Sequence, residues 1–256
     1  MTERAAVAVT GATGLVGSAL VASLVGAGHT VRRLVRRSAP PLAGVQDVPW
    51  NPSAGELDVR DLAGLGAVVH LAGESVAQRW TPKVKDDIRT SRVDSTRLLA
   101  ERLARLEPPP RVLVSASAVG IYGNRGDEVL DESSSLGSDF LAGVGRDWEA
   151  ATEPAARAGV RVVNTRFGIV LSAHGGALTK MLPPFRLGAG GTLGDGSQWT
   201  SWVALADVVS ALRFAIDRES MAGPVNVTAP TPVTNAQFTQ TLGEVLHRPT
   251  LARVPK

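Results

Sequence analysis

Short runs of apolar residues alternate along the chain with longer segments in which apolar residues recur every three or four positions. The short runs predict buried strands, and the longer periodic segments predict amphipathic helices. The predicted strands are residues 5–10, 29–36, 66–73, 111–117, 160–171 and 224–228. The predicted helices are residues 14–28, 83–106, 138–158, 205–218 and 235–248. This alternation indicates an α/β fold in which a doubly wound parallel sheet carries helices on both faces.

The regular alternation loosens after Leu171, and residues 175–202 are rich in glycine and proline. This composition favours a small, loop-rich C-terminal lobe near the mouth of the sheet. We expect residues 1–171, completed by the strand near 224–228, to form the main domain, and residues 172–256 to form the lobe. The chain has no internal repeat or low-complexity linker, so the lobe is expected to share the core of the sheet.

Composition and charge narrow the classes of function. Of the 256 residues, 44% are hydrophobic and 20% are charged, which is typical of a globular protein with a sizeable core. The absence of cysteine excludes disulfides and cysteine-ligated metal, and the four histidines show no metal-binding spacing, so we expect no metal site. The net charge is only +3 and residues 32–37 form the one dense basic cluster, so we expect no nucleic-acid partner.

The sequence also bears on location. The N-terminal segment has an acid at Glu3 and runs directly into a predicted strand, which is not the layout of a signal peptide. The longest apolar segment, residues 14–25, is too short and too interrupted by glycine to span a bilayer. We therefore expect a cytoplasmic protein without a membrane partner.

Glycines stand at Gly11, Gly14 and Gly17, directly after the first predicted strand and at the opening of the first predicted helix. The first glycine permits a tight turn, the second lets the backbone approach a diphosphate, and the third lets the helix pack close to the sheet. The free N–H groups at the helix start would then face the phosphates of a dinucleotide. We therefore expect residues 1–171 to bind a dinucleotide, with contacts that include Thr13, Leu15 and Val16.

The end of the second strand indicates which dinucleotide is bound. An acid there usually binds the ribose 2′-hydroxyl of NAD, whereas an arginine suits the 2′-phosphate of NADP. This chain has no acid there and instead has Arg36 and Arg37, so we predict NADP rather than NAD; the alternative is that both arginines are simply solvated. Leu71, Ala72 and Gly73 stand at the end of another predicted strand, where small residues would let the chain run beside the cofactor. A simple strand end is the alternative interpretation of this segment.

Four segments, TGATGLVG, HLAGES, SASAVGIYG and WTSWVALADVV, together resemble the extended short-chain dehydrogenases, which form the NAD(P)-dependent epimerase/dehydratase superfamily. A closer resemblance is to its "epimerase family" subgroup, whose marks lie at residues 71–75, 79–80, 91–92, 140–141, 148–149 and 184–202. The resemblance covers nearly the whole chain and implies a Rossmann sheet of the short-chain dehydrogenase type. It also implies cofactor contacts at Asp87, Arg92, Arg166, Ile169 and Val170.

The resemblance carries two further expectations. Members of the family continue for some tens of residues past a segment like 235–249, so part of the C-terminal lobe is expected to be absent from this chain. In similar proteins the helices that correspond to 83–106 and 138–158 pair across a two-fold axis, which predicts a homodimer.

The chemistry usual in this family requires a serine or threonine, a tyrosine and a lysine, the last two in a Tyr-x-x-x-Lys motif. The predicted helix that should carry this motif contains neither residue. If Glu149 is aligned with the acid that follows the motif, Leu141 and Gly145 take the tyrosine and lysine positions. A shift of one residue gives Phe140 and Val144, so neither alignment restores the pair.

Two side chains remain as catalytic candidates. Ser117 matches the position of the family's serine, and Ser115 is the neighbouring alternative, which we expect beside the cofactor. Tyr122 is the only tyrosine and could replace the missing acid, although packing or a substrate contact is the alternative. The sequence shows no Ser-His-Asp order that supports a hydrolase.

Two functions fit these observations. The first is an NADP-dependent oxidoreductase or epimerase that acts on a small molecule, either a sugar nucleotide or a small carbonyl or alcohol, with unconventional acid–base chemistry. The second is a non-catalytic NADP(H)-binding sensor or regulator. Ser117 and the elaborated lobe favour the first function, and the missing tyrosine and lysine favour the second.

Overall fold

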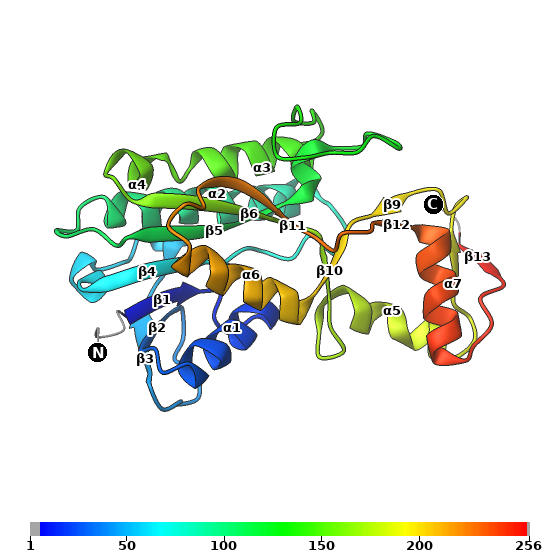
Figure 1. The fold of residues 1–256 in the computed structure, drawn as a ribbon, viewed down its shortest axis with the longest axis horizontal. Helices are drawn as coiled ribbons and strands as arrows, with labels where there is room; N and C mark the ends of the chain where they lie inside the picture. Colours follow the sequence, from blue (N-terminus) through cyan, green and yellow to red (C-terminus); the bar gives the residue numbers. More distant parts are fainter. Residues whose placement is uncertain (1–5, 255–256) are drawn as a thin grey trace.

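The computed structural model describes residues 6–254, so Ala5, at the start of the first predicted strand, lies outside the described residues. Its centre is a seven-stranded parallel sheet with the strand order β11-β6-β5-β4-β1-β2-β3 (Figure 1). The strands are β1 (Ala6–Thr10), β2 (Val31–Val35), β3 (Val45–Pro49), β4 (Leu65–His70), β5 (Val112–Ala118), β6 (Arg161–Phe167) and β11 (Gly223–Val227). The strand order reverses between β1 and β4, which confirms the predicted doubly wound fold.

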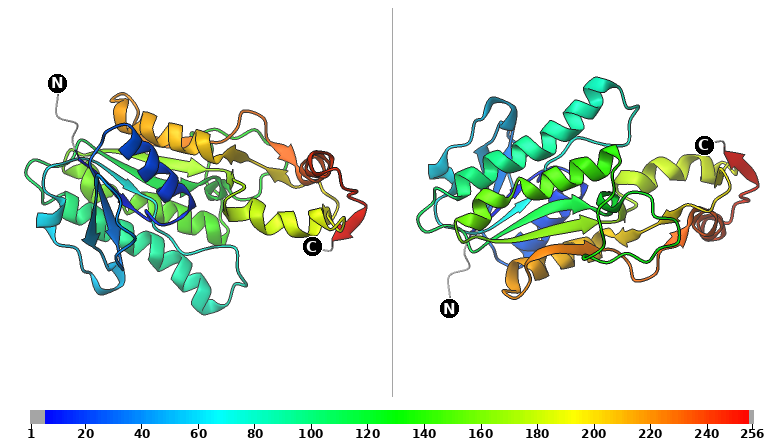
Figure 2. Two further views of the ribbon diagram at one scale, coloured as in Figure 1. Left: turned by 90° about the horizontal axis from the view of Figure 1, so that it is seen from below. Right: turned by 90° about the horizontal axis from the view of Figure 1, so that it is seen from above.

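Helices cover both faces of this sheet (Figure 1, Figure 2). One face carries α1 (Leu15–Gly26) and α6 (Leu205–Asp217), and the other carries α2 (Pro82–Leu103), α3 (Phe140–Ala150) and α4 (Glu153–Arg157). Along β1, Val7 and Val9 pack with Leu20 of α1, whereas Ala8 packs on the opposite face in a cluster with Leu99 of α2. Each fully buried leucine in these clusters contributes about 1.5–3 kcal/mol to stability.

Several elements differ from the sequence-based expectation. β3 and the short 3-10 turns η1 (Pro52–Ala54), η2 (Val59–Leu62) and η3 (Val119–Tyr122) were not predicted. The strand expected at 160–171 is divided at Gly168 into β6 and β7 (Ile169–Leu171), and β7 pairs with β10 (Trp202–Ala204) instead of joining the main sheet. A Cβ atom on Gly168 would lie 2.6 Å from the carbonyl oxygen of Ser201, the residue before β10, so the close approach of that backbone requires glycine at 168.

The C-terminal lobe lies beyond the carboxyl ends of the sheet strands (Figure 2). It contains α5 (Gly176–Arg186), β8 (Gly191–Leu193), β9 (Trp199–Thr200), β12 (Val233–Thr234), α7 (Asn235–Leu246) and β13 (Ala252–Val254). Helix α5, which includes Pro183 and Pro184, lies within the glycine- and proline-rich segment 175–202 and was not predicted. Leu182 and Phe185 of this helix are buried, and this packing outweighs the backbone hydrogen bonds that proline cannot donate.

No helix among residues 6–254 combines the length and apolar character that a bilayer crossing requires.

Candidate cofactor and reaction site

The glycine loop between β1 and α1 is held by backbone contacts. Gly11 has φ +61°, and a Cβ atom there would lie 2.7 Å from the carbonyl carbon of Leu71. A Cβ atom on Gly17 would lie 2.2 Å from the Gly11 carbonyl oxygen. At Gly14 the nearest atom would be 3.3 Å away, and that atom belongs to the loop itself. Glycine at 11 and 17 is thus required by packing, whereas Gly14 leaves room for an approaching ligand.

The N-terminus of α1 suits an anion. Its cap, Gly14, provides no side-chain oxygen, and the first turn contains no acidic residue. The first N–H groups of α1, including those of Leu15 and Val16, therefore have neither an intrahelical partner nor a capping carboxylate. Thr13, Gly14 and Leu15 also line an open hollow between α1 and the start of α5. Exposed amides and the helix dipole at such a site favour a phosphate group.

The segment 71–73 is positioned by a buried hydrogen-bond chain. Thr10 Oγ1 accepts hydrogen bonds from the backbone N–H groups of Leu71 (3.0 Å) and Ala72 (3.2 Å). It lies 2.7 Å from His70 Nδ1 and donates its own proton there, while His70 Nε2 lies 3.3 Å from Ser95 Oγ. Burial lowers the pKa of His70 from 6.5 to about 4, so the imidazole is neutral and can accept the Thr10 proton.

Arg36 and Arg37 follow β2 and are exposed. The loop that carries them is anchored by a partly buried ion pair, in which Arg33 Nε donates to Asp47 Oδ1 over 2.7 Å. Asp47 also accepts from the backbone N–H of Ala39 (2.9 Å), and Arg33 donates to the Pro40 carbonyl (3.1 Å). Asp47 is therefore engaged by Arg33 and the loop, and the two exposed guanidinium groups remain for a phosphate.

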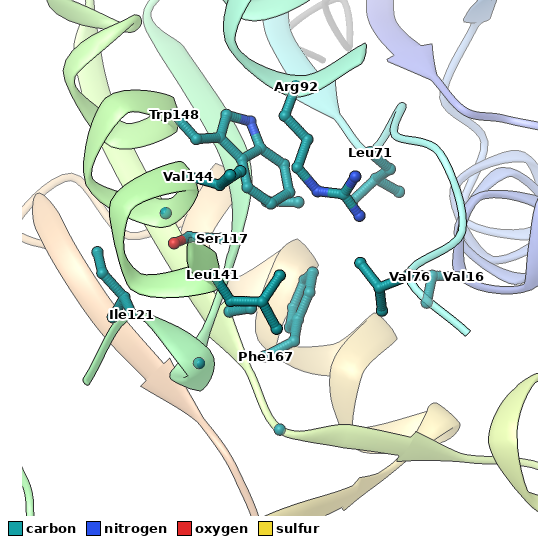
Figure 3. A pocket seen from close by; sticks show the side chains of 15 residues that line it. Val16, Leu71, Val76, Arg92, Ser117, Ile121, Leu141, Val144, Trp148 and Phe167 are labelled. Carbon is teal, nitrogen blue, oxygen red and sulfur yellow. The ribbon is translucent and has the colours of Figure 1, made fainter. Parts of the chain in front are cut away.

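A cavity of about 300 Å³ opens between the carboxyl end of β5, the segment after β4, and helices α2 and α3 (Figure 3). Val16 and Leu71 line it on the side of the glycine loop, and Ser117 lines it on the side of β5. The other lining residues are Val76, Arg92, Ala116, Ala118, Gly120, Ile121, Leu141, Val144, Gly145, Trp148, Phe167 and Gly168. The cavity thus joins the predicted cofactor site to the predicted catalytic serine.

Ser117 belongs to a buried polar network. Its hydroxyl donates to Glu149 Oε1 over 2.6 Å, and Figure 3 shows the oxygen turned towards α3. Arg166, which is opposite Ser117 in the β5–β6 register, binds both oxygens of Glu149, each over 2.8 Å. The hydrogen bonds to Glu149 raise the pKa of Arg166 above its usual value. Arg166 also donates to Tyr122 Oη (2.9 Å), and Tyr122 in turn donates to Asn226 Oδ1 (2.8 Å).

Helix α3 presents an apolar surface to the cavity. Both alignments of the Tyr-x-x-x-Lys motif fall on this stretch, where Leu141, Val144 and Gly145 line the cavity together with Trp148. A Cβ atom on Gly145 would lie 3.1 Å from Ile121, so α3 packs closely against η3 at that position. The helical spacing of Leu141, Val144 and Trp148 was visible in the sequence as part of an amphipathic stripe, but nothing in it showed that the stripe faces a cavity.

The other predicted site residues lie in different surroundings. Arg92 lines the cavity, and its guanidinium lies 5.1 Å from the ring centroid of Trp148. Tyr122 and Arg166 are buried in the polar network and do not line the cavity. Asp87 is paired with Lys83 on the exposed side of α2, and Ser115 is buried with its hydroxyl 3.4 Å from the Ala116 carbonyl.

Ile169 and Val170 belong to β7. Ile169 is 40% exposed, and Val170 packs against the core cluster beneath α1 and α6. Neither side chain lines the cavity. Glu149 was recognised in the sequence only as a motif residue, because its contact with Ser117 joins positions 32 residues apart. Among residues 6–254, no group of three or more His, Asp or Glu side chains is arranged to hold a metal ion.

A doubly wound sheet, an uncapped glycine loop at its switch point and a serine-containing cavity beside that loop define a dinucleotide-binding protein of the short-chain dehydrogenase type. Residues 7–228 match the NAD dependent epimerase/dehydratase family, and the chain belongs to this family.

The chain has relatives of known sequence and of known structure. It is 48% identical over 252 residues to an epimerase family protein of Mycobacterium bovis, Mb2239, and covers 82% of that protein with 98% of its own length. The structure of human epimerase family protein SDR39U1 (isoform 2) with NADPH is 32% identical, with a TM-score of 0.85 over 98% of this chain and 83% of that one. A nucleoside-diphosphate sugar epimerase from Corynebacterium glutamicum is 43% identical, with a TM-score of 0.81 over 98% of this chain and 53% of that one.

Proposed function

We propose that this protein binds NADP(H) and transfers hydride between its nicotinamide and a small molecule, either a sugar nucleotide or a small carbonyl or alcohol. The observation that carries the proposal is the cavity whose walls include both Val16, beside the glycine loop, and Ser117. The bound nicotinamide would supply or accept the hydride. The protein would hold the cofactor, exclude water with the apolar walls of the cavity and orient the reacting carbon.

The glycine loop fits the diphosphate because amides without partners surround an open Gly14. Arg36 and Arg37 would bind the 2′-phosphate, since the nearby acid Asp47 is already engaged by Arg33. Leu71, Ala72 and Gly73 would run along the cofactor. The relation to a human protein whose structure contains NADPH supports the preference for NADP over NAD.

A second function has its own support. The α3 wall, with Leu141, Val144 and Gly145, lacks the tyrosine and lysine of the family's usual chemistry. Such a protein would hold NADP(H) and report its redox state to a partner without turnover. The homodimer and the cytoplasmic location remain predictions from the sequence.

A two-stage experiment tests the proposal. Fluorescence titration with NADPH and NADH measures binding, and we expect tighter binding of NADPH. Loss of deuterium from nicotinamide-labelled NADPH is then followed across sugar nucleotides and carbonyl compounds. Label transfer that falls in Ser117→Ala supports the enzyme; NADPH binding with no transfer to any compound supports the sensor. Failure to bind either nucleotide would overturn both functions.

A further inference from the structure

The cavity offers very few polar side chains to a substrate. Of its lining residues, only Arg92, Ser117 and Trp148 have polar side-chain atoms, and the indole Nε1 of Trp148 is buried with no partner among the described residues. The remaining walls are aliphatic or aromatic, or consist of glycine and alanine. The reacting part of the substrate therefore meets one hydroxyl and one guanidinium in apolar surroundings.

The Ser117 hydroxyl directs its proton away from this cavity. It donates to Glu149 Oε1 over 2.6 Å, and a carboxylate can only accept hydrogen bonds. Arg166 occupies both oxygens of the same carboxylate and compensates its charge. In this arrangement Ser117 can accept a hydrogen bond from a ligand but does not supply a proton to a newly formed alkoxide. Tyr122 is committed to Asn226 and Arg166, so it offers no substitute.

Arg92 is the one charged side chain among the residues that line the cavity. Among residues 6–254 its guanidinium donates a single hydrogen bond, from Nη1 to the Ile88 carbonyl over 3.1 Å, and it stacks on Trp148. Burial lowers its pKa, but a guanidinium remains charged in proteins. A guanidinium has five N–H donors, so Arg92 keeps donors and a positive charge for an oxyanion in the cavity.

We propose that the substrate is a conjugated carbonyl compound, a quinone or an α,β-unsaturated ketone, and that Arg92 binds the oxyanion formed from it. This inference rests on the proposed hydride transfer and narrows its substrate class. In an enone, hydride from the reduced nicotinamide forms a C–H bond at the β-carbon, and the π electrons move to the carbonyl oxygen, which becomes an enolate oxygen. In a quinone, the hydride forms an O–H bond at one carbonyl oxygen, and the π electrons move through the ring to the other oxygen, which becomes a phenolate oxygen. The resulting enolate or phenolate then takes a proton from water, and the nicotinamide leaves oxidised.

Conjugation removes the need for the missing acid. A phenol has a pKa of about 10, so its anion forms near neutral pH far more readily than an alkoxide, which is about as basic as hydroxide. Reduction of an isolated ketone therefore needs a proton donor in the cavity, whereas reduction of a quinone or enone needs only charge stabilisation. The guanidinium of Arg92 provides that stabilisation.

The same walls are unsuited to a hexose ring. Each sugar hydroxyl that enters an apolar cavity without a hydrogen-bond partner carries a desolvation penalty. Apart from Ser117 and Arg92, the described side chains of the wall expose no such partner to the cavity, because the indole Nε1 of Trp148 is buried. A flat, apolar conjugated ring makes favourable contact with these same side chains.

The test uses one matched pair of substrates. Cyclohex-2-enone and cyclohexanone differ only in conjugation, and menadione serves as the quinone. We expect NADPH-dependent reduction of the enone and of menadione with kcat/KM at least about 100-fold above that for cyclohexanone. UDP-glucose and UDP-galactose are assayed with NADP⁺ and for interconversion, and neither reaction is expected.

Each outcome decides between the two proposals. Equal turnover of enone and ketone, or interconversion of the sugar nucleotides, overturns the conjugated-carbonyl inference and leaves the proposed hydride transfer standing. NADPH binding without turnover of any compound overturns both. Turnover of the conjugated compounds alone supports both.

The role of Arg92 is tested separately at saturating NADPH. Arg92→Gln should lower kcat for the enone at least about tenfold, and Arg92→Lys should restore part of it, because the lysine keeps the charge. Arg89→Gln is the matched control, since Arg89 lies on the same helix but on its exposed side, paired with Asp147. Nucleotide affinity is measured for each variant by fluorescence. Unchanged kcat in Arg92→Gln would overturn the assignment of Arg92.

Discussion

The site has two walls: the first, the glycine loop and the segment after β4, is held by close backbone contacts, whereas the second, helix α3, presents apolar side chains to the cavity. On the first wall, Gly11 and Gly17 touch backbone so closely that a Cβ would collide with it. On the second wall, Leu141 and Val144 stand where the family's usual chemistry places polar groups. We therefore expect dinucleotide binding and the chemistry of the cavity to be separable, so that each can be disturbed alone.

Gly17→Ala should have the largest effect, because it disrupts the packing of α1 against the glycine loop in the first wall. The new Cβ would meet the Gly11 carbonyl oxygen at 2.2 Å, and that oxygen is held by the Gly14 N–H over 2.9 Å. We expect a loss of about 4 kcal/mol in the free energy of unfolding and at least about 100-fold weaker NADPH binding. Urea unfolding and fluorescence titration measure the two effects.

The matched control lies in the same helix. A Cβ atom on Gly26 would meet nothing within 4 Å, so Gly26→Ala should stay within about 1 kcal/mol of the wild type. Wild-type NADPH affinity in Gly17→Ala would show that the close contact of α1 with the loop is not needed for binding.

Glu149→Gln should have the next largest effect, and it disturbs the second wall. The substitution leaves the buried guanidinium of Arg166 without its carboxylate, and breaking such a pair costs about 3 kcal/mol. We expect lower stability in urea but unchanged NADPH affinity, because the network does not touch the glycine loop. Glu153→Gln is the control: it removes an exposed pair with Arg157 and should change stability by less than about 1 kcal/mol. A parallel loss of NADPH affinity in Glu149→Gln would contradict the separability of the two walls.

The free energy of unfolding should also depend on pH, because His70 is buried at the end of β4, beside the first wall. Its folded-state pKa of about 4 lies below its unfolded value of 6.5, so the unfolded state binds more protons between these values. The stability that the neutral imidazole contributes is therefore fully present above pH 6.5 and is lost as the pH falls towards 4. The loss amounts to about 3 kcal/mol.

Urea unfolding from pH 7 to pH 4.5 measures this dependence. His70→Asn should make the free energy of unfolding less dependent on pH in this range. His174→Gln should leave the pH dependence unchanged, since His174 is exposed. An equal slope in wild type and His70→Asn would show that other groups cause the acid sensitivity.

The first wall could be anticipated from sequence, whereas the polar network behind the second wall could not, for a physical reason. The glycine spacing and the strand before it are local, and they specify a turn and a helix start within a dozen residues. The Ser117–Glu149 contact requires β5 and α3 to pack together, and Arg166 joins them only through the β5–β6 register. Side chains that meet across three elements leave no local pattern.

The differences in secondary structure have the same origin. Pro183 and Pro184 signalled loops, yet tertiary burial of Leu182 and Phe185 keeps them within a helix. β3 is short and includes the polar residues Gln46 and Asp47, and it is held at the sheet edge by pairing with β2 and by the Arg33–Asp47 contact. In both cases a distant contact outweighed the local preference.

The smallest expected effect concerns the loop after β2, which carries the proposed ligands of the 2′-phosphate. Asp47 joins Arg33 to the Ala39 N–H, three residues beyond Arg36. Asp47→Asn weakens this anchor without touching the proposed phosphate ligands. We expect NADPH affinity to fall about fivefold, equivalent to about 1 kcal/mol, with little change for NADH.

Fluorescence titration of both nucleotides at one salt concentration measures the ratio of the NADPH affinity to the NADH affinity. Glu128→Gln is the control for charge, because it removes one carboxylate from an exposed pair with Arg125. If both nucleotides weaken equally in Asp47→Asn, the anchor supports the sheet edge in general rather than the 2′-phosphate site. A selective loss for NADPH would instead show that a residue remote from the nucleotide contributes to its choice by holding the loop in place.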